Sequence, residues 1–210
     1  MLFRVILLAA CLHTATDAAT TQPAAVIRQW VLELGAPEPD VREAARRNLL
    51  NLTPADLGTL RAIVAEGAAN LPCQAAALYD VVRHVYLTGE QVTRSNERLS
   101  FLGLRLFQIG TLGEAPLGMT FERRLMGFPA FAAFEEGDVL ISVEELPDSY
   151  LTSMASLSYV RERIPPGTLV HFRVLRDDRF VSVPITLAAT PAPESQTDAA
   201  VAARQQRAED

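Results

Sequence analysis

The chain is poor in the residues that bind metals and serve as bases in most enzymes. Its 210 residues include three histidines and two cysteines. His84 stands beside core positions of a helical pattern, and His171 alternates with apolar residues of a strand-like segment. Both are interpreted as surface or hydrogen-bonded residues rather than as catalytic bases. No pair has the spacing of a metal site. We therefore expect a protein that is not an enzyme and uses no cofactor.

The sequence also lacks an excess of positive charge. Its 19 basic residues, all arginine, stand against 25 acidic residues and give a formal net charge of -6. Carboxylates are spread among the arginines, so no basic stripe is available for a nucleic-acid backbone. The glycines at positions 103, 110, 113 and 118 do not lie between a buried parallel strand and a lysine-bearing helix start, so they make no phosphate loop. Nucleic acid is not an expected partner.

Long hydrophobic runs are absent beyond one near the N-terminus. Residues 1–18 combine Arg4 with an apolar run and end in small residues, which is typical of a secretory signal peptide. The run is shorter than the roughly 20 apolar residues that cross a bilayer. We expect export to the periplasm or the exterior, with cleavage near Ala18. The run also ends in a bacterial lipobox pattern at Cys11, so membrane association through a lipidated Cys11 is an alternative, as is a buried N-terminal helix.

Residues 25–89 have the periodicity of amphipathic helices. Apolar residues recur at helical spacing in four segments, and glycines follow the first and the last of them. Short connections predict that consecutive helices are antiparallel neighbours. The four predicted helices begin near residues 26, 40, 54 and 72.

Two of these helices have start signals in the sequence. Asp40 is followed three positions later by Glu43, which is the pattern of a capping box. The run Thr53-Pro54-Ala55-Asp56 repeats the pattern and adds a proline at the first helical position. Both signals predict a helix that begins at that point.

The segment from Leu32 to Ala45 resembles the start of a HEAT-type helical repeat. The helical region has room for about two helix pairs, fewer than the three or more repeats that a free-standing solenoid usually needs. These helices are therefore expected to form a small bundle or to lean on the C-terminal half. An ordinary amphipathic bundle rich in alanine and leucine is the alternative.

Beyond Arg98 the periodicity changes from that of helices to that of strands. Residues 181–187 alternate between apolar and polar, and the turn 176–179 joins them to residues 169–175 in a predicted hairpin. Pro184 cannot donate a ladder hydrogen bond, which places it near a sheet edge.

Two polar stretches flank this β-rich region. Thr88 to Arg98 lacks apolar periodicity and is predicted to be a hinge. Residues 190–210 replace the apolar pattern with proline, alanine, glutamine and charged residues, and are predicted to be a disordered tail.

Two motifs in the C-terminal half occur in a fixed order. The run Phe101-Leu102-Gly103-Leu104 resembles the carboxylate-binding loop of PDZ domains, and residues 133–143, with Gly137-Asp138, resemble a stretch of the bacterial PDZ modules attached to periplasmic proteases. The likeness covers residues 99–189, including a helix-like stretch from Thr152 to Arg163. It implies a PDZ-like, partly open β-barrel with a flanking helix. The expected fold class is α+β with two domains, a HEAT-like helical region at 25–89 and a PDZ-like domain at 99–189.

The same resemblance implies a peptide-binding site made largely of backbone groups. Gly103 would let a peptide carboxylate approach the loop amides, and the strand from Leu104 to Phe107 would accept the peptide as an added strand. If the groove is not functional, the apolar members of this set are simply core residues. The implied site residues are Phe101, Leu102, Gly103, Leu104, Arg105, Leu106, Met154 and Leu157.

One departure from the family pattern lies before Gly137-Asp138. Where bacterial members carry small residues, this chain has Phe128, Phe131 and Phe134 at a spacing of three. One of these rings is expected at the surface. The departure does not touch the carboxylate loop.

The expected function is that of an exported, non-enzymatic adaptor that binds extended peptides or protein C-termini. A protease with such a module would need a further domain with a serine nucleophile, a histidine and an aspartate, for which the chain has no room. One alternative is a structural or assembly protein with a degenerate groove, in which the helices make the contact. Another is a regulatory partner of a separately encoded protease.

Overall fold

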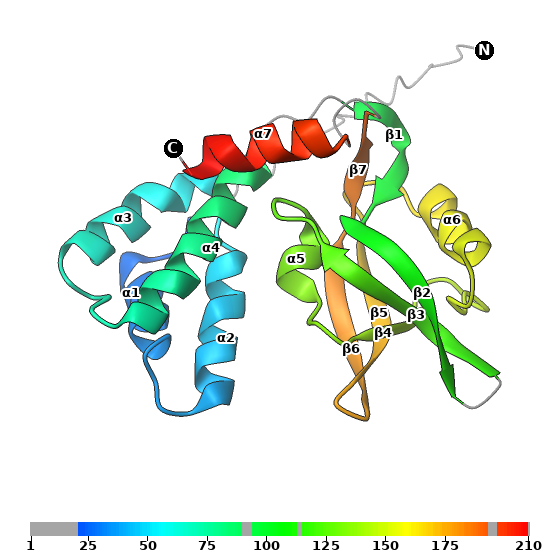
Figure 1. Ribbon diagram of the computed structural model, residues 1–210, viewed down its shortest axis with the longest axis horizontal. Coiled ribbons are helices and arrows are strands. Elements are labelled where there is room, and N and C mark those ends of the chain that lie inside the picture. Colours follow the sequence, from blue (N-terminus) through cyan, green and yellow to red (C-terminus); the bar gives the residue numbers. More distant parts are fainter. Residues whose placement is uncertain (1–20, 90–93, 113–114, 193–196, 210) are drawn as a thin grey trace, which may run out of the picture.

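The computed structural model describes residues 21–89, 94–112, 115–192 and 197–209. Within these ranges the chain has seven α-helices and two β-sheets, which confirms the predicted α+β class. The helices of the N-terminal half gather beside the strands of the C-terminal half (Figure 1). The expected signal peptide, residues 1–18 with Cys11, lies outside the described residues.

The N-terminal half is helical, as its periodicity predicted. Each helix turns an apolar stripe toward one shared cluster, in which Ile27, Val31, Leu49 and Val81 are fully or almost fully enclosed. No helix in the described ranges is long and apolar enough to cross a membrane. The elements are α1 (Ala24–Glu33), α2 (Pro39–Leu50), the 3-10 turn η1 (Pro54–Asp56), α3 (Leu57–Ala65) and α4 (Pro72–Gly89).

Both predicted helices are found, but only one of the two predicted capping boxes is confirmed. The Asp56 carboxylate accepts hydrogen bonds from the backbone N–H and the hydroxyl of Thr53, at 2.9 and 2.7 Å. By contrast, α2 begins one residue earlier than expected, with Pro39 at its first position and Glu38 before it, and no side chain caps it. Proline at the first helical position fixes a helical φ, so the helix starts there and Asp40 lies inside its first turn.

The strands form a five-stranded sheet in the order β2-β3-β4-β5-β6 and a two-stranded sheet of β1 and β7. All pairings are antiparallel. Since β2 and β6 have a neighbour on one side only, the described strands make an open sheet and no closed barrel. The strands are β1 (Arg94–Phe101), β2 (Leu104–Leu112), β3 (Ala115–Arg124), β4 (Val139–Val143), β5 (Leu169–Arg176), β6 (Arg179–Thr186) and β7 (Ala188–Pro191).

The predicted hairpin is formed by β5 and β6. Asp177 and Asp178 both have positive φ, 46° and 59°, as the favoured two-residue hairpin turn requires. Pro184 lies opposite His171 on edge strand β6, which confirms its predicted place. The backbone carbonyl of His171 accepts from Glu144 on the other side, so the Pro184 nitrogen faces away from β5.

Three phenylalanines around the short helix α5 (Pro129–Ala133) point to three different neighbours. Phe128 packs edge-on against Phe101, Phe131 joins the cluster of the N-terminal helices, and Phe134 packs edge-on against Phe172 in the sheet core. All three rings are buried, so the expectation of an exposed phenylalanine is wrong. Only Phe131 lies within α5, while Phe128 and Phe134 flank the helix in extended backbone, so the three rings point in different directions and each meets an apolar surface.

The turn before β4 is held by a buried ion pair. Asp138, 2% exposed, receives two hydrogen bonds from the Arg176 guanidinium at 2.7 and 2.8 Å and a third from the Glu135 backbone N–H at 2.8 Å. The hydrogen bonds to Asp138 raise the pKa of Arg176 despite partial burial. The Gly137-Asp138 motif is therefore a structural turn in this chain.

Both polar stretches differ from the expectation. In the predicted hinge, Thr88 belongs to α4 and Arg94–Arg98 belong to β1, because pairing with β7 supplies the order that local composition does not show. In the predicted disordered tail, Thr190 and Pro191 belong to β7 (Ala188–Pro191), and Asp198–Glu209 form helix α7. Helix α7 lies across the end of α4 (Figure 1), so tertiary contact stabilises a segment of polar composition.

Candidate functional site

Leu102 and Gly103 form the connection between β1 and β2, with Gly103 at a positive φ of 82°. The carbonyl oxygen of Leu102 accepts from the Ala130 N–H at 3.0 Å, and that of Gly103 accepts from the Leu125 N–H at 2.8 Å. Among described residues, no hydrogen bond outside the strand ladders uses the N–H of Leu102 or Gly103 as donor. The carbonyl groups are thus fixed, and two successive amides are available to an acceptor.

A hollow of about 300 Å³, part of it open to solvent, lies between this loop and helix α6 (Met154–Arg163). Helix α6 is placed by Ser153, whose hydroxyl accepts from the Ser156 N–H at 3.2 Å. Five of the eight predicted site residues, from the loop and from the helix-like stretch, thus line one hollow, while Gly103 between Leu102 and Leu104 is not a lining residue. The hollow is lined by Phe101, Leu102, Leu104, Met154, Leu157 and Arg161.

The apolar lining is shared between the hollow and the core. Leu102, Leu104 and Leu157 are 5%, 6% and 3% exposed and belong to the sheet core, so the core interpretation applies to them as well. Met154 is 54% exposed at the start of α6 and adds no such core contact. The leucines make the rigid floor of the hollow, and Met154 is a flexible rim.

Arg161 is the lining residue that sequence reasoning missed. Its Nε donates to the backbone oxygen of Ser100 at 2.9 Å, and its Nη2 donates to the Thr190 hydroxyl at 3.2 Å. Burial lowers the pKa of this guanidinium, although the neighbouring Glu162 acts against the shift. No motif marks Arg161, because its position depends on the long-range pairing of β1 with β7.

Arg105 and Leu106 do not line this hollow in the described structure. Nη1 of Arg105 pairs with Asp198 of α7 at 2.8 Å, on the other side of the loop. Leu106 belongs to β2, but its side chain is outside the described part of the chain.

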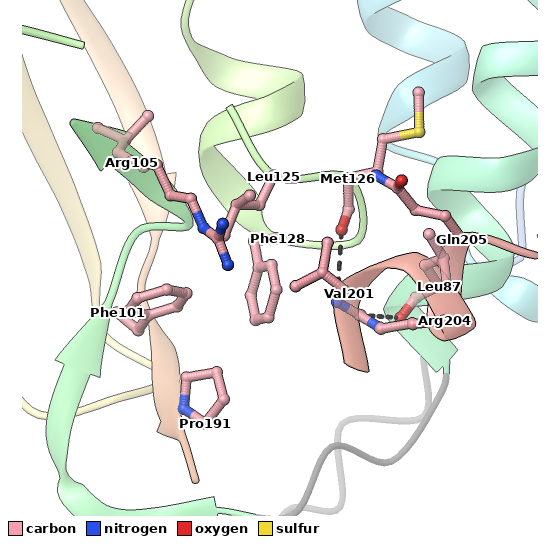
Figure 2. A pocket seen from close by; sticks show the side chains of 11 residues that line it. Leu87, Phe101, Arg105, Leu125, Met126, Phe128, Pro191, Val201, Arg204 and Gln205 are labelled. Atoms are coloured by element: carbon pink, nitrogen blue, oxygen red, sulfur yellow. Dashed lines mark hydrogen bonds between the residues drawn. The ribbon is translucent and has the colours of Figure 1, made fainter. Parts of the chain in front are cut away.

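A second hollow, of about 540 Å³ including open solvent, lies on the α7 side of the same loop. Phe101 and Leu104 line both hollows. Figure 2 shows Arg204 of α7 hydrogen-bonded to the carbonyl oxygens of Leu87 and Met126, at 2.8 and 3.5 Å. Its guanidinium also lies 4.7 Å from the ring centroid of Phe128. Helix α7 thereby joins the end of α4 to the back of the candidate peptide loop.

The two histidines of the described residues are held by hydrogen bonds. His84 is 2% exposed, stacks on Phe131 at a centroid distance of 5.0 Å and accepts from the Gly127 N–H through Nδ1 at 3.0 Å. Burial, together with the positive charges of Arg46 and Arg204, lowers its pKa to about 4. Its imidazole is therefore neutral near pH 7, with the proton on Nε2.

His171 lies on the exposed side of β5 and contacts one carboxylate. Its Nδ1 lies 2.6 Å from Glu145 Oε1, and its backbone N–H donates to the same carboxylate. Partial burial alone would raise the pKa of Glu145, but these hydrogen bonds outweigh it and lower the pKa. Within the described ranges, no group of three or more His, Cys, Asp or Glu residues is placed to hold a metal ion.

No family model and no curated protein matches the chain. Among solved structures, the chain is similar to an HtrA-type protease, AlgW, with a decapeptide, at 19% identity and a TM-score of 0.39, covering 57% of this chain and 36% of that one. A variant of the same protease is 19% identical, with a TM-score of 0.40, and the match covers 59% of this chain and 36% of that one. An aminopeptidase N family protein from Idiomarina loihiensis is 17% identical, with a TM-score of 0.36, and the match covers 80% of this chain and 31% of that one. The chain spans about a third of the length of these proteins. At these TM-scores the likeness carries no functional argument, which has to come from the site itself.

Proposed function

We propose that the protein is an exported, non-enzymatic adaptor whose PDZ-like half binds an extended peptide or a protein C-terminus between β2 and α6. The observation that carries the proposal is that loop 101–104 and helix α6, about fifty residues apart in the chain, line one hollow. The sequence resemblance implies a groove between the same two segments, which supports the proposal.

The groups around the hollow suit an extended chain that ends in a carboxylate. Leu102 lines the hollow and Gly103 follows it in the chain, and we assign their two amides, which donate no hydrogen bond outside the strand ladders, as the donors for an anion. The leucines give an apolar seat for the last side chain. Strand β2 is an edge of the five-stranded sheet, so an incoming strand can add its backbone hydrogen bonds there. The chemistry needs no reacting side chain, which is why we propose binding rather than catalysis.

The test is direct binding of decapeptides with varied apolar C-terminal residues to the full chain, measured by fluorescence anisotropy. Met154→Arg places a long side chain on the rim of the hollow at an exposed position, so the fold should persist while peptide affinity falls about tenfold or more. Tyr159→Arg is the matched control, because Tyr159 is exposed on the same helix and does not line the hollow. Failure of all peptides to bind, or equal losses in both variants, would refute the proposed groove.

One observation favours assembly through the helices as a second candidate function. Tyr79, Val82 and Tyr86 of α4 are 50%, 40% and 44% exposed and recur at helical spacing. If these residues make the functional contact, Tyr79→Ala and Tyr86→Ala should abolish partner capture, and free C-terminal peptides should not compete with the partner. Competition by such peptides would instead support the groove.

A further inference from the structure

Arg161 places a guanidinium at the end of the hollow next to the candidate carboxylate loop. It lines the hollow together with Phe101 and Leu102, and its Cζ lies 6.0 Å from the ring centroid of Phe101. The bonds of Nε to Ser100 and of Nη2 to Thr190 hold the guanidinium against β1 and β7. The position of the charge is therefore fixed before any ligand arrives.

Arg161 makes no ion pair in the described structure. Both of its hydrogen bonds go to neutral oxygens, no described ion pair includes it, and Nη1 has no described acceptor. The adjacent Glu162 favours the charge only through Coulomb attraction beyond ion-pair distance, and burial outweighs it. The side chain is only partly exposed, so water solvates the charge incompletely. A partly buried cation without an ion-pair partner is costly, and an incoming anion would offset that cost.

We infer that Arg161 is a specificity-determining residue, which binds the terminal carboxylate of the peptide and selects free C-termini over internal segments. The inference rests on the proposed groove and deepens it, because the loop amides alone would also accept a backbone carbonyl. Nη1 of Arg161 adds a charged donor for which a carboxylate is the fitting acceptor. Since Met154 lies two turns earlier on α6, about 10 Å away along the helix, the peptide would run from Arg161 toward Met154.

The alternative is a purely structural role, in which Arg161 only holds α6 against β1 and β7. The experiment must therefore separate a loss of stability from a loss of carboxylate binding. The decapeptides that bind most tightly are each prepared in two forms, as a free acid and as a C-terminal carboxamide. Both forms are titrated into the full-length wild type, R161Q and R163Q. Arg163 provides the matched control, since it lies on the same helix, is exposed and does not line the hollow.

We expect the wild type and R163Q to prefer the free acid about tenfold or more. R161Q should lose about tenfold in affinity for the free acid and less than about twofold for the carboxamide, as the loss of one charged hydrogen bond predicts. R161M, which keeps an apolar stem without the charge, repeats the test if R161Q shows no cooperative melt. R161K should retain part of the preference, because it keeps the charge but not the planar donor pair.

Three results would overturn the inference. Equal losses for both peptide forms in R161Q would mean that Arg161 only supports the fold. Equal binding of both forms by the wild type would mean that the groove binds internal segments, which refutes the role of Arg161 and leaves the proposed groove intact. Absence of binding to either form would refute the groove and the inference together.

Discussion

Protonation of His84 should destabilise the folded protein as the pH falls. The imidazole is enclosed between α4 and α5, accepts a hydrogen bond from Gly127 and has Arg46 of α2 and Arg204 of α7 as positive neighbours. A second proton would end the acceptor role of Nδ1 and place a positive charge in an apolar stack. The folded state therefore resists a proton that the unfolded chain binds readily.

The size of the effect follows from the pKa. The folded pKa is about 4, against an ordinary value of 6.5. A folded pKa below the unfolded one gives stability that is fully present above about pH 6.5 and is lost as the pH falls toward 4. Each pKa unit corresponds to about 1.4 kcal/mol, so the whole interval is worth about 3 kcal/mol. That is a large share of the 5 to 15 kcal/mol typical of a domain.

The assay is urea unfolding of the full chain at several pH values between about 7.5 and 4, followed by circular dichroism. His84→Gln keeps a side-chain oxygen that can accept from Gly127 but cannot take up a proton in this range. We expect the free energy of unfolding of the variant to be lower than that of the wild type near pH 7.5 and to fall less steeply with acid. Because burial is the largest cause of the shift, added salt should leave most of the wild-type slope in place.

Two results would refute this reasoning. An NMR titration that places the His84 pKa near 6.5 would show that the imidazole is not desolvated in solution. Equal slopes for the wild type and His84→Gln would assign the acid sensitivity to other groups.

Asp138→Ala should lower the free energy of unfolding by about 3 kcal/mol, because Arg176 loses two hydrogen bonds to a buried carboxylate and keeps only its ion pair with Glu135; an unchanged urea midpoint would contradict this. Gly103→Ala should also destabilise the fold, since a Cβ there would lie 2.2 Å from Phe128 Cβ at a positive φ, and a variant with a wild-type melting temperature would show that the loop can shift. Arg204→Ala should cost about 1 to 2 kcal/mol through the hydrogen bonds lost at the end of α4, and hydrogen exchange should show faster opening of α7 but not of the sheet.

The helices were predictable where the signal is local. The Thr53–Asp56 start and the span of α4 depend on residues that are close in sequence, and the structure confirms both. The same holds for the hairpin turn at Asp177 and Asp178 and for the edge position of Pro184. In each case a short-range steric or hydrogen-bond rule decides the conformation.

Long-range pairing could not be predicted in the same way. Strand β1 consists mainly of polar residues and becomes a strand because β7, about ninety residues later, pairs with it. Helix α7 has a weakly amphipathic sequence and is held by Arg204 on distant carbonyl groups. Arg161 joins the candidate site for the same reason, since its two anchors lie on β1 and β7.

For the candidate site, the motifs predicted which segments meet but not what each side chain does. Five of the predicted residues line one hollow, while Arg105 pairs with Asp198 of α7 instead. The five are Phe101, Leu102, Leu104, Met154 and Leu157. The space beside Gly103 is filled by Phe128, so a larger residue there would disturb the fold. The glycine indicates a close approach, but only the packed structure shows which side chain makes it.

Helix α5 places Phe131 in the core of the N-terminal helices and Phe134 in the core of the sheet, only three residues apart. A fragment of residues 95–190 would expose on its surface the ring of Phe131, which in the full chain packs on His84 and the N-terminal helices. Moving the β-rich half into another protein would therefore require a polar replacement at Phe131, or a segment of α4 that covers it. The same ring would make a partly digested form of the protein prone to self-association, so the survival of its β-rich half would depend on how quickly the helices are lost.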